Sequence, residues 1–320
     1  MEYRNIPGTD LTPSAICLGG AGFCHPDNKQ EAFRIFDLFY SLGGNFIDTA
    51  NVYGRWLDGG LNTNERIIGE WMKERKNSGR MIVTTKGAHP PADRSCSRLS
   101  KEDIAADVDS SLRALQTDHI DLYYLHRDDE ALPVEEIMES LNSFVRDGKI
   151  RYLGASNWTA VRIAAANAYA RENGLEPFKA NQPMWSLATI NADKIPDQTL
   201  VPMEAEMYLM HLKTGMAAIP YSSQAMGFFT KLAKDLSTAN QMPVYDNEAN
   251  FLKLERVKEL ADAHNATVNQ IALAYLLSQP FVTIPIVGCK TEEALADSLG
   301  AETIPRLSTD DLLYLGLSAE

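Results

Sequence analysis

The feature that most constrains this chain is a regular alternation of short apolar runs with longer amphipathic runs. The apolar runs have the length and continuity of strands buried on both faces. Strands that alternate with helices pair in parallel through right-handed crossovers. Eight such strands are predicted, at residues 15–18, 46–49, 81–85, 120–125, 150–155, 179–182, 217–220 and 282–287.

The amphipathic runs between the strands carry helix signals. Ser100 is predicted to cap a helix, because Asp103 follows it and apolar residues then recur at helical spacing. Pro133 precedes another helix, and Asp147-Gly148 ends that helix. Helices are predicted at residues 30–42, 100–115, 134–146, 159–171, 202–213, 250–264, 268–278 and 291–299, and polar loops at 187–199 and 238–250.

Eight strand–helix units in 320 residues favour a (β/α)8 TIM barrel. The alternative is a doubly wound open sheet, which needs a GxGxxG fingerprint after the first strand. The glycines here are spaced differently, as Gly19-Gly20-Ala21-Gly22, and no helix follows at once. Residues 3–6, a turn at 7–10 and the segment from Leu11 are predicted to form an N-terminal β-hairpin that caps the bottom of the barrel. No linker divides the chain, so one domain over residues 1–320 is expected.

Composition narrows the partners. Lys and Arg number 30 against 43 Asp and Glu, giving a net charge of −13, which disfavours nucleic acid. The start of the chain has no signal-peptide core, and the apolar helical stretch 271–277 is too short to span a bilayer. The four cysteines show no CxxC spacing, so reduced thiols in the cytoplasm are expected. Nothing in the sequence specifies an oligomeric state.

Polar side chains of catalytic type follow three consecutive strands, where barrel active sites lie. Asp48 ends the second strand, with Tyr53 just beyond, Lys86 ends the third and His126 the fourth. Taken singly, each has an ordinary structural explanation, as a turn cap, a rim aromatic, a solvated lysine or a core histidine. Their joint occurrence at three neighbouring strand ends predicts one catalytic group.

The chemistry of the four side chains suits the reduction of a carbonyl group. The reaction needs a hydride on carbon and a proton on oxygen. Tyr53 could donate the proton, since the ammonium of Lys86 would lower the pKa of the phenol and Asp48 would hold Lys86 in place. His126 could orient the carbonyl oxygen.

The segments FIDTANVYG, TTKG, YLHR and GKIRYLGASN resemble those of the aldo-keto reductase family, in the family's order. The resemblance covers nearly the whole chain. It implies a (β/α)8 barrel, NAD(P)H as hydride donor without a Rossmann domain, and the catalytic roles above.

The resemblance also implies cofactor contacts. Ser156, Asn157 and Gln182 match the residues that bind the nicotinamide carboxamide, and Trp185 stands where the family usually has a stacking tyrosine. The segment from Tyr221 to Gly227 resembles the pyrophosphate loop, with Ser223-Gln224 in place of Pro-Leu. The predicted contacts in this loop are Tyr221, Ser222, Ser223, Gln224, Ala225 and Gly227.

The adenosine end of the cofactor site is expected near the last strand. Gly288 and Lys290 resemble its phosphate-binding segment, and Lys290 could pair with a 2′-phosphate, which favours NADP(H) over NAD(H). Ala294 replaces the arginine or glutamine of many NADP-dependent members, so NAD(H) stays open. Asp297 and Ser298 stand where Glu-Asn commonly contacts adenine.

The substrate pocket is predicted to be lined by side chains that follow the same strand ends: Phe23, Arg55, Trp56, His126, Arg127 and Trp158. An aromatic platform with Arg55 and the acids Asp128 and Asp129 suits a polyhydroxylated substrate, such as a sugar or its derivative. The loops at 55–64 and 88–98 are expected to shape selectivity.

Three other functions remain open. The enzyme could oxidise a sugar with NAD⁺. A nucleotide-sensing regulatory subunit also stays open, although the presence of all four catalytic candidates disfavours it. A metal-dependent hydrolase or lyase using Asp48 and His126 is disfavoured, because no HxH or clustered carboxylate spacing occurs. No metal is therefore expected.

Overall fold

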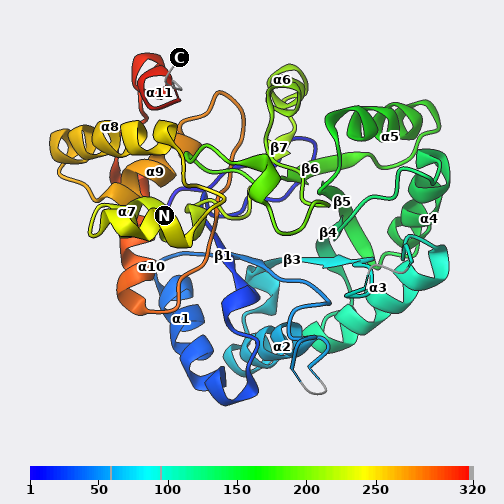
Figure 1. Cartoon of the computed structure of the whole chain (residues 1–320). Helices are drawn as coiled ribbons and strands as arrows, with labels where there is room; N and C mark the ends of the chain where they lie inside the picture. The colour runs from blue at the N-terminus through cyan, green and yellow to red at the C-terminus, as the bar shows by residue number, and fades with distance from the viewer. Residues whose placement is uncertain (58–59, 94–95, 317–320) are drawn as a thin grey trace.

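Eight parallel strands form a sheet that closes on itself, as the sequence predicts (Figure 1). The computed structural model describes residues 1–57, 60–93 and 96–316. The sheet order is β7-β6-β5-β4-β3-β2-β1-β8, and backbone hydrogen bonds from Ala218 to Val282 and from Ile284 to Ala218 close the ring. The predicted (β/α)8 barrel is confirmed. The strands are β1 Cys17–Gly19, β2 Phe46–Asp48, β3 Ile82–Gly87, β4 Ile120–Leu125, β5 Ile150–Ser156, β6 Phe178–Gln182, β7 Ala217–Ala218 and β8 Ile286–Val287.

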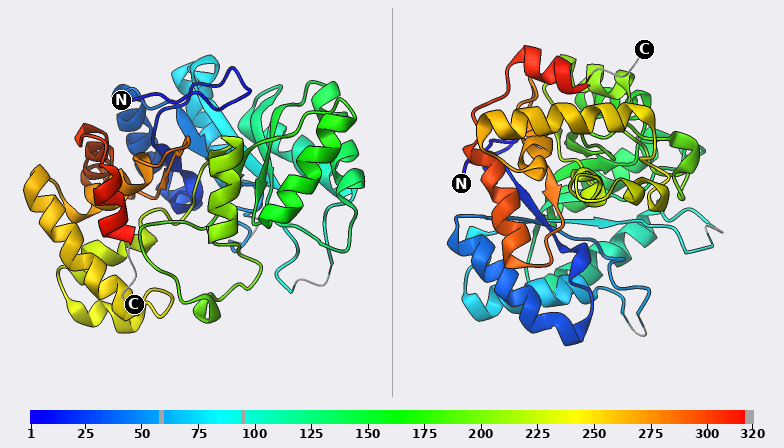
Figure 2. Two further views of the ribbon diagram at one scale, coloured as in Figure 1. Left: turned by 90° about the horizontal axis from the view of Figure 1, so that it is seen from above. Right: turned by 60° about the vertical axis from the view of Figure 1, so that its left-hand side comes forward.

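Helices surround the strands (Figures 1 and 2). All eight predicted helices form. The side chain of Ser100 caps the helix Lys101–Leu115 by accepting a hydrogen bond from the Asp103 amide at 3.1 Å. The helices α2, α7 and α11 were not predicted. The α-helices of the described chain are α1 Lys29–Ser41, α2 Thr63–Arg75, α3 Lys101–Leu115, α4 Val134–Arg146, α5 Ala160–Glu172, α6 Ala205–Thr214, α7 Phe228–Leu232, α8 Glu248–His264, α9 Val268–Leu277, α10 Glu292–Leu299 and α11 Thr309–Gly316.

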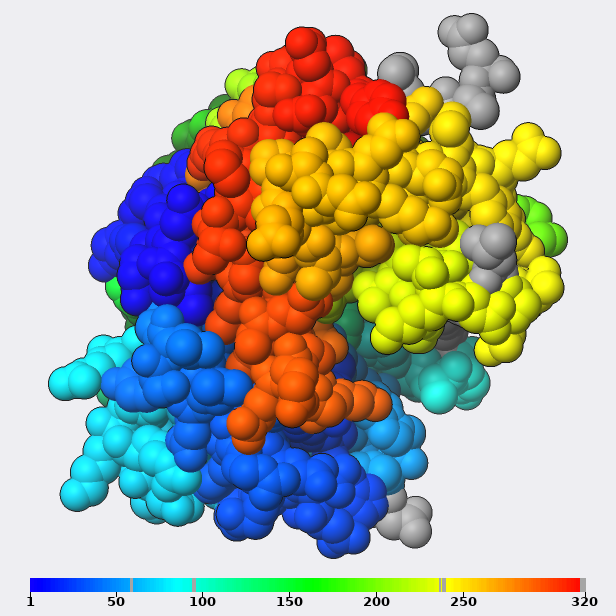
Figure 3. All heavy atoms as spheres, turned by 90° about the vertical axis from the view of Figure 1, so that its left-hand side faces the viewer, coloured from blue at the N-terminus to red at the C-terminus, as the bar shows by residue number. Residues whose placement is uncertain are grey.

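Apolar side chains fill the space between the strands and the helices. One cluster joins β1, β2 and β3 to α1 and α2, and includes the fully buried Phe36 and Trp71. Figure 3 shows α10, in orange, beside the blue α1 and below the amber region of α8 and α9. These contacts place β8 next to β1, and α10 next to α1, as the closed barrel requires.

The N-terminal hairpin forms as predicted. Tyr3 pairs antiparallel with Ser14, and the Arg4 amide donates to Pro13 at 2.8 Å. The Arg4 guanidinium donates to the carbonyls of Leu277 and Thr283, both at 2.8 Å, which fixes the hairpin to the barrel. The hairpin therefore closes the end of the barrel opposite the carboxyl ends of the strands.

Residues 1–57, 60–93 and 96–316 contain neither a membrane-spanning helix nor a cluster of metal-ligating side chains. None of the helices there combines the length and apolarity that a membrane crossing needs. No group of three or more His, Cys, Asp or Glu side chains there could hold a metal ion.

Candidate active site

The four predicted catalytic residues converge at the carboxyl ends of β2, β3 and β4. The Lys86 ammonium lies 2.6 Å from Asp48 Oδ2 and donates to the Thr49 carbonyl at 2.7 Å. Lys86 Nζ also lies 3.5 Å from the Tyr53 hydroxyl. The imidazole of His126 faces the ring of Tyr53 edge-on, with 6.1 Å between centroids. These four residues form the tetrad, which is one continuous group of contacts.

The turn after β2 places Tyr53 over Lys86. The Asn51 amide donates to the Lys86 carbonyl at 2.9 Å, so the turn continues the pairing of β2 with β3. Gly54 then adopts a φ of +104°, which favours glycine. A Cβ at Gly54 would also collide with the Gly60 carbonyl oxygen. A glycine is therefore needed for the phenol to reach the strand ends.

Lys86 and Asp48 form a buried ion pair, with exposed side-chain fractions of 1% and 4%. Burial opposes a charged Lys86, but the Asp48 carboxylate raises the pKa of the lysine overall. Burial raises the pKa of Asp48, while hydrogen bonds from Lys86 and Gln182 oppose that shift. We therefore treat the pair as an ammonium and a carboxylate near neutral pH.

Two opposing effects act on the pKa of Tyr53. Burial raises the pKa of the phenol, and this exceeds the lowering effect of Lys86. Lys86 thus acts in the predicted direction, but the net pKa is raised. The phenol keeps its proton near neutrality, and the adjacent ammonium would stabilise the phenolate left after donation.

His126 is neutral near pH 7. Burial lowers the pKa of its imidazole to well below the usual value, and the positive charge of Lys86 adds to this shift. Nδ1 of the ring is buried and has no hydrogen-bond partner among the described residues. His89, which the sequence analysis missed, packs edge-on against it with centroids 4.7 Å apart.

A cavity of about 500 Å³ runs from the tetrad toward β8. At one end lie Asp48 and Tyr53, and at the other the loop after β7 and Gly288. The glycine-rich segment after β1, which lacks the doubly wound fingerprint, also lines it through Gly19 and Gly22. An elongated ligand could therefore lie along the strand ends with one end at Tyr53.

The loop after β7 has the backbone of an anion-binding turn. Ser222, Ala225, Met226 and Gly227 all have positive φ, and successive N–H groups in such turns form concave anion sites. The side chain of Ser223 is buried and donates to the Ile286 carbonyl at 2.5 Å. Ser223 therefore fixes the loop to β8, and its backbone alone could contact a ligand.

Gln224 connects the same loop to α9, to α10 and to the segment after β8. Its amide nitrogen donates to Asn269 at 3.0 Å and to Ser298 at 3.1 Å, and its oxygen accepts from the Gly288 amide at 3.2 Å. These bonds show how the loop is held where Ser223-Gln224 replaces Pro-Leu. The side chain of Gln224 holds the loop through hydrogen bonds to three distant segments.

The predicted nicotinamide contacts meet beside the tetrad. Ser156 Oγ donates to the Gln182 carbonyl at 3.0 Å, and Gln182 donates to Asp48 at 2.8 Å. The Asn157 amide donates to the His126 carbonyl at 3.1 Å, and its oxygen accepts from the Tyr221 hydroxyl at 2.7 Å. β5 and β6 thus present three amide or hydroxyl groups next to Tyr53.

Trp185, the predicted stacking residue, packs in a hydrophobic cluster. Its ring is buried against Phe281, with centroids 6.0 Å apart, and meets Tyr208 and Tyr275 edge-on. These partners belong to α6, α9 and the segment before β8, so the indole fills a hydrophobic cluster outside the cavity. The described residues on the cavity wall include Tyr221. The stacking role of Trp185 stays a prediction.

The two predicted adenine contacts, Asp297 and Ser298, make hydrogen bonds within the protein. Ser298 is fully buried and donates to the Ala294 carbonyl at 2.8 Å, so its side chain cannot contact adenine. Asp297 accepts hydrogen bonds from Thr267 at 2.7 Å and Asn269 at 2.8 Å, joining α10 to α9. Lys290 is exposed, and its aliphatic chain lies against Gly22, which lines the cavity. Lys290 remains the candidate phosphate ligand.

Two predicted substrate contacts are core residues. Phe23 is 4% exposed and packs edge-on against Phe36. Trp158 is fully buried against Phe178, because Asn157 turns the backbone with a φ of +59° and directs the next side chain toward α5. Neither can line a substrate pocket.

The charged substrate candidates behave differently from one another. Arg127 pairs with Asp197 at 3.1 Å, and Asp128 pairs with Arg162 at 2.9 Å. Arg55 is half-buried, and Trp56 is 65% exposed at the rim. The predicted selectivity loops reach residues 58–59 and 94–95, which lie outside the described residues.

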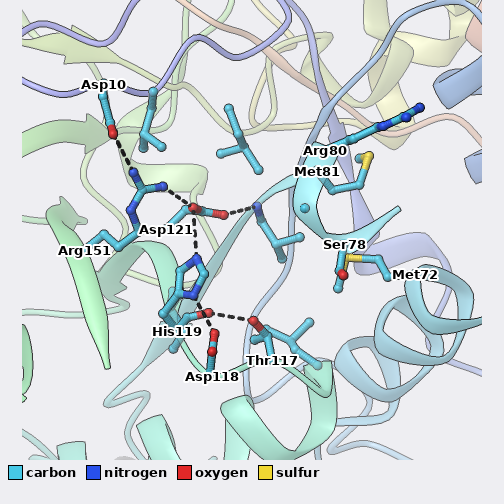
Figure 4. A pocket seen from close by; sticks show the side chains of 16 residues that line it. Asp10, Met72, Ser78, Arg80, Met81, Thr117, Asp118, His119, Asp121 and Arg151 are labelled. Atoms are coloured by element: carbon cyan, nitrogen blue, oxygen red, sulfur yellow. Dashed lines mark hydrogen bonds and ion pairs between the residues drawn. The ribbon is translucent and has the colours of Figure 1, made fainter. Parts of the chain in front are cut away.

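A second hollow, of about 410 Å³, lies at the opposite end of the barrel (Figure 4). Most of its charged groups contact one another. Arg151 bridges Asp10 and Asp121 at 2.7 Å, and His119 lies beside Asp118 at 2.7 Å. Polar networks at this end of a barrel usually serve stability.

Several known proteins are similar to this chain in sequence and in fold. The family model described as "Aldo/keto reductase family" matches residues 15–315. An aryl-alcohol dehydrogenase of Pestalotiopsis microspora is 32% identical, over 95% of this chain and 78% of the relative. A relative from Phanerodontia chrysosporium, named aryl-alcohol dehydrogenase [NADP(+)], is 32% identical over 98% of this chain and 85% of its own.

A third relative, norsolorinic acid reductase B of Dothistroma septosporum, is 31% identical over 94% of this chain and 77% of its own. Among solved structures, the thermostable aldo-keto reductase Tm1743 in complex with the inhibitor epalrestat superposes with a TM-score of 0.73. It is 26% identical, and the match covers 99% of both chains. By sequence and by fold, the chain belongs to the aldo/keto reductase family.

Proposed function

We propose that this oxidoreductase reduces an aldehyde or ketone to the alcohol, with NADPH as hydride donor and Tyr53 as proton donor. The observation that carries the proposal is the placement of Tyr53, 3.5 Å from Lys86, at one end of a cavity that leads to an anion-binding turn. A binding site for a nicotinamide nucleotide needs catalytic groups at one end and a phosphate-binding segment at the other.

The residues present fit such a cofactor. Ser156, Asn157 and Gln182 would hold the carboxamide, and Tyr221 would lie against the nicotinamide ring. The backbone of residues 222–227 would receive the pyrophosphate, and Lys290 the 2′-phosphate. When bound, the cofactor supplies a hydride to the carbonyl carbon.

The chain's own residues would handle the oxygen. His126, neutral and without a side-chain hydrogen bond among the described residues, would donate to the carbonyl oxygen and orient it. Tyr53 would transfer its proton to that oxygen as the hydride arrives. Lys86, held by Asp48, would stabilise the resulting phenolate.

The test is an assay of NADPH and NADH consumption across aldoses, keto-sugars and aromatic aldehydes, with Tyr53→Phe beside the unmodified enzyme. Tyr53→Phe should lower kcat by about 100- to 10,000-fold, the usual contribution of a general acid. The variant should still bind NADPH. Full activity in Tyr53→Phe would overturn this mechanism.

The same panel addresses the substrate class. The names of the relatives favour aromatic carbonyl compounds. The sugar hypothesis retains Arg55 and Trp56 but has less support from the acids, because Asp128 pairs with Arg162 and Asp129 accepts a hydrogen bond from the Ala131 amide at 3.1 Å. A preference for aldoses over aromatic aldehydes would restore it.

The remaining predictions are part of the same proposal. The oxidative direction with NAD⁺ would show as faster turnover of the alcohol than of the carbonyl at matched concentrations. A regulatory subunit would show slow turnover with tight cofactor retention. A single barrel domain over residues 1–320 and a cytoplasmic location are also retained as proposals.

A further inference from the structure

Arg55 is a half-buried arginine without a carboxylate partner in the described chain. Among the described residues, its guanidinium makes a single hydrogen bond, from Nη1 to the Pro90 carbonyl at 3.2 Å. A guanidinium has five N–H donors in a rigid fork, so most of them remain available. The contrast with its neighbours is clear, because Arg98 pairs with Asp107 at 2.8 Å and Arg127 with Asp197 at 3.1 Å.

Arg55 stands beside the reacting groups. It follows Tyr53 by two residues and reaches the loop after β3 at Pro90. His89, the residue before Pro90, packs directly on His126. The charge of Arg55 contributes to lowering the pKa of both imidazoles. The guanidinium is therefore within electrostatic reach of the position where a carbonyl oxygen would bind.

The local charge around Arg55 is incompletely balanced. Burial lowers the pKa of its guanidinium, the positive charge of Arg98 adds to this, and Asp107 opposes it. Asp107 itself is already paired with Arg98. A partly buried cation of this kind gains most from a ligand that brings a negative charge.

The anion is not expected to come from the cofactor. The cavity that leads from Tyr53 to the turn after β7 is lined by Gly19, Gly22, Tyr221 and their neighbours, and Arg55 is not among its described lining residues. The anion-binding turn lies at the far end of that cavity. An anion at Arg55 would instead belong to the molecule whose carbonyl contacts Tyr53 and His126.

We propose that Arg55 binds an oxyanion carried by the substrate, a carboxylate or a phosphate, close to its reacting carbonyl. The inference rests on the proposed carbonyl reduction. It narrows the substrate class to anionic aldehydes or ketones, aromatic or sugar-derived. The planar fork of Arg55 suits bidentate contact with either group.

The test compares matched substrate pairs in the complete enzyme. Benzaldehyde is compared with para-carboxybenzaldehyde, and glyceraldehyde with glyceraldehyde phosphate, in the unmodified chain, Arg55→Met, Arg55→Lys and the control Arg171→Met. Arg171 is exposed on α5. Arg55→Met should lower kcat/KM for the anionic partner by about 10- to 100-fold, mostly through KM. Arg55→Lys should lie between, and Arg171→Met should match the unmodified enzyme.

The two pairs distinguish the sources of the anion. A loss confined to the carboxylated aldehyde assigns a carboxylate, and a loss confined to the phosphorylated one assigns a phosphate. Equal loss for neutral and anionic partners, or no loss for either anion, would overturn the inference while leaving carbonyl reduction intact.

If no aldehyde is reduced, the proposed function fails separately. Calorimetric titration with para-carboxybenzaldehyde then still decides the role of Arg55. Weaker binding to Arg55→Met than to Arg171→Met supports the anion site, and equal binding overturns it. Thermal unfolding of each variant checks that the fold is retained.

Discussion

At the scale of single residues, the tetrad combines two requirements that conflict in most proteins. An ammonium must be buried beside a phenol, and it must remain charged. Burying an ion is costly unless a counter-ion and hydrogen bonds accompany it. Asp48 at 2.6 Å and the Thr49 carbonyl at 2.7 Å meet this need for Lys86. Gln182 at 2.8 Å fixes Asp48 in turn.

The roles of Tyr221 and Trp185 in cofactor binding can be distinguished by matched substitutions. Tyr221→Leu should weaken NADPH binding by about 10-fold, because a ring on the cavity wall is lost. Trp185→Leu should leave the Kd for NADPH unchanged and lower the free energy of unfolding by about 2 kcal/mol, because it leaves a void in a buried cluster. Calorimetric titration and chemical denaturation measure the two quantities.

The opposite pattern would return Trp185 to the stacking role that the sequence predicts. That pattern is a raised Kd for NADPH in Trp185→Leu together with an unchanged Kd in Tyr221→Leu.

At the scale of the elements, the strand ends were predictable and one important helix was not. The helix α2, Thr63–Arg75, carries many charged residues and buries polar ones, including Glu65. The Glu65 carboxylate accepts from Thr85 at 2.6 Å and also from Asn62. A helix whose inner face contains satisfied polar groups lacks the apolar stripe on which sequence prediction depends.

Helix α6 carries a buried histidine that should make stability depend on pH. His211 is fully buried, stacks on Phe281, and its Nδ1 lies 2.8 Å from the Met216 carbonyl. Burial lowers the pKa of His211 from 6.5 to about 4. Below about pH 6.5 the unfolded chain binds a proton that the folded chain does not. Stability should therefore fall as pH drops from about 6.5 to about 4, by up to about 3 kcal/mol for this residue.

The measurement is chemical denaturation of the unmodified chain and His211→Gln at several pH values within that range. The variant should show a shallower loss of stability on acidification, whereas the exposed His25→Gln should follow the unmodified chain. Parallel curves for all three proteins would contradict the buried neutral state of His211.

At the scale of the whole molecule, the closed barrel joins segments from both ends of the chain into one cavity. Gly22, after β1, lines the cavity, and Lys290, after β8, lies against it, although 268 positions separate them. The net charge of −13 makes Lys290 a conspicuous cation at this rim. Its role therefore depends on a closure that no local pattern encodes.

Lys290 should decide the preference for NADPH over NADH. Lys290→Ala should weaken NADPH binding by about 10-fold and leave NADH binding unchanged, because only NADPH carries the 2′-phosphate. Thermal unfolding with each cofactor should show the same difference, since a ligand stabilises the folded state according to its affinity. Lys213→Ala, an exposed lysine on α6, is the control. Equal weakening for both cofactors would show that Lys290 does not contact the 2′-phosphate.

The sequence by itself determined the barrel and the position of the tetrad. Both follow from chain order, because parallel strands that alternate with helices bring all their carboxyl ends to one rim. Asp48, Lys86 and His126 each stand within one residue of such an end, so their convergence needs no further information.

Only the tertiary structure decided which side chains near the rim are available to a ligand. Trp185 is held by Phe281, Asp128 by Arg162 and Arg127 by Asp197, all distant in the sequence. Arg55 has no such carboxylate partner in the described chain. The direction of a side chain beyond a strand end depends on the turn it occupies and on which remote group can bury or neutralise it.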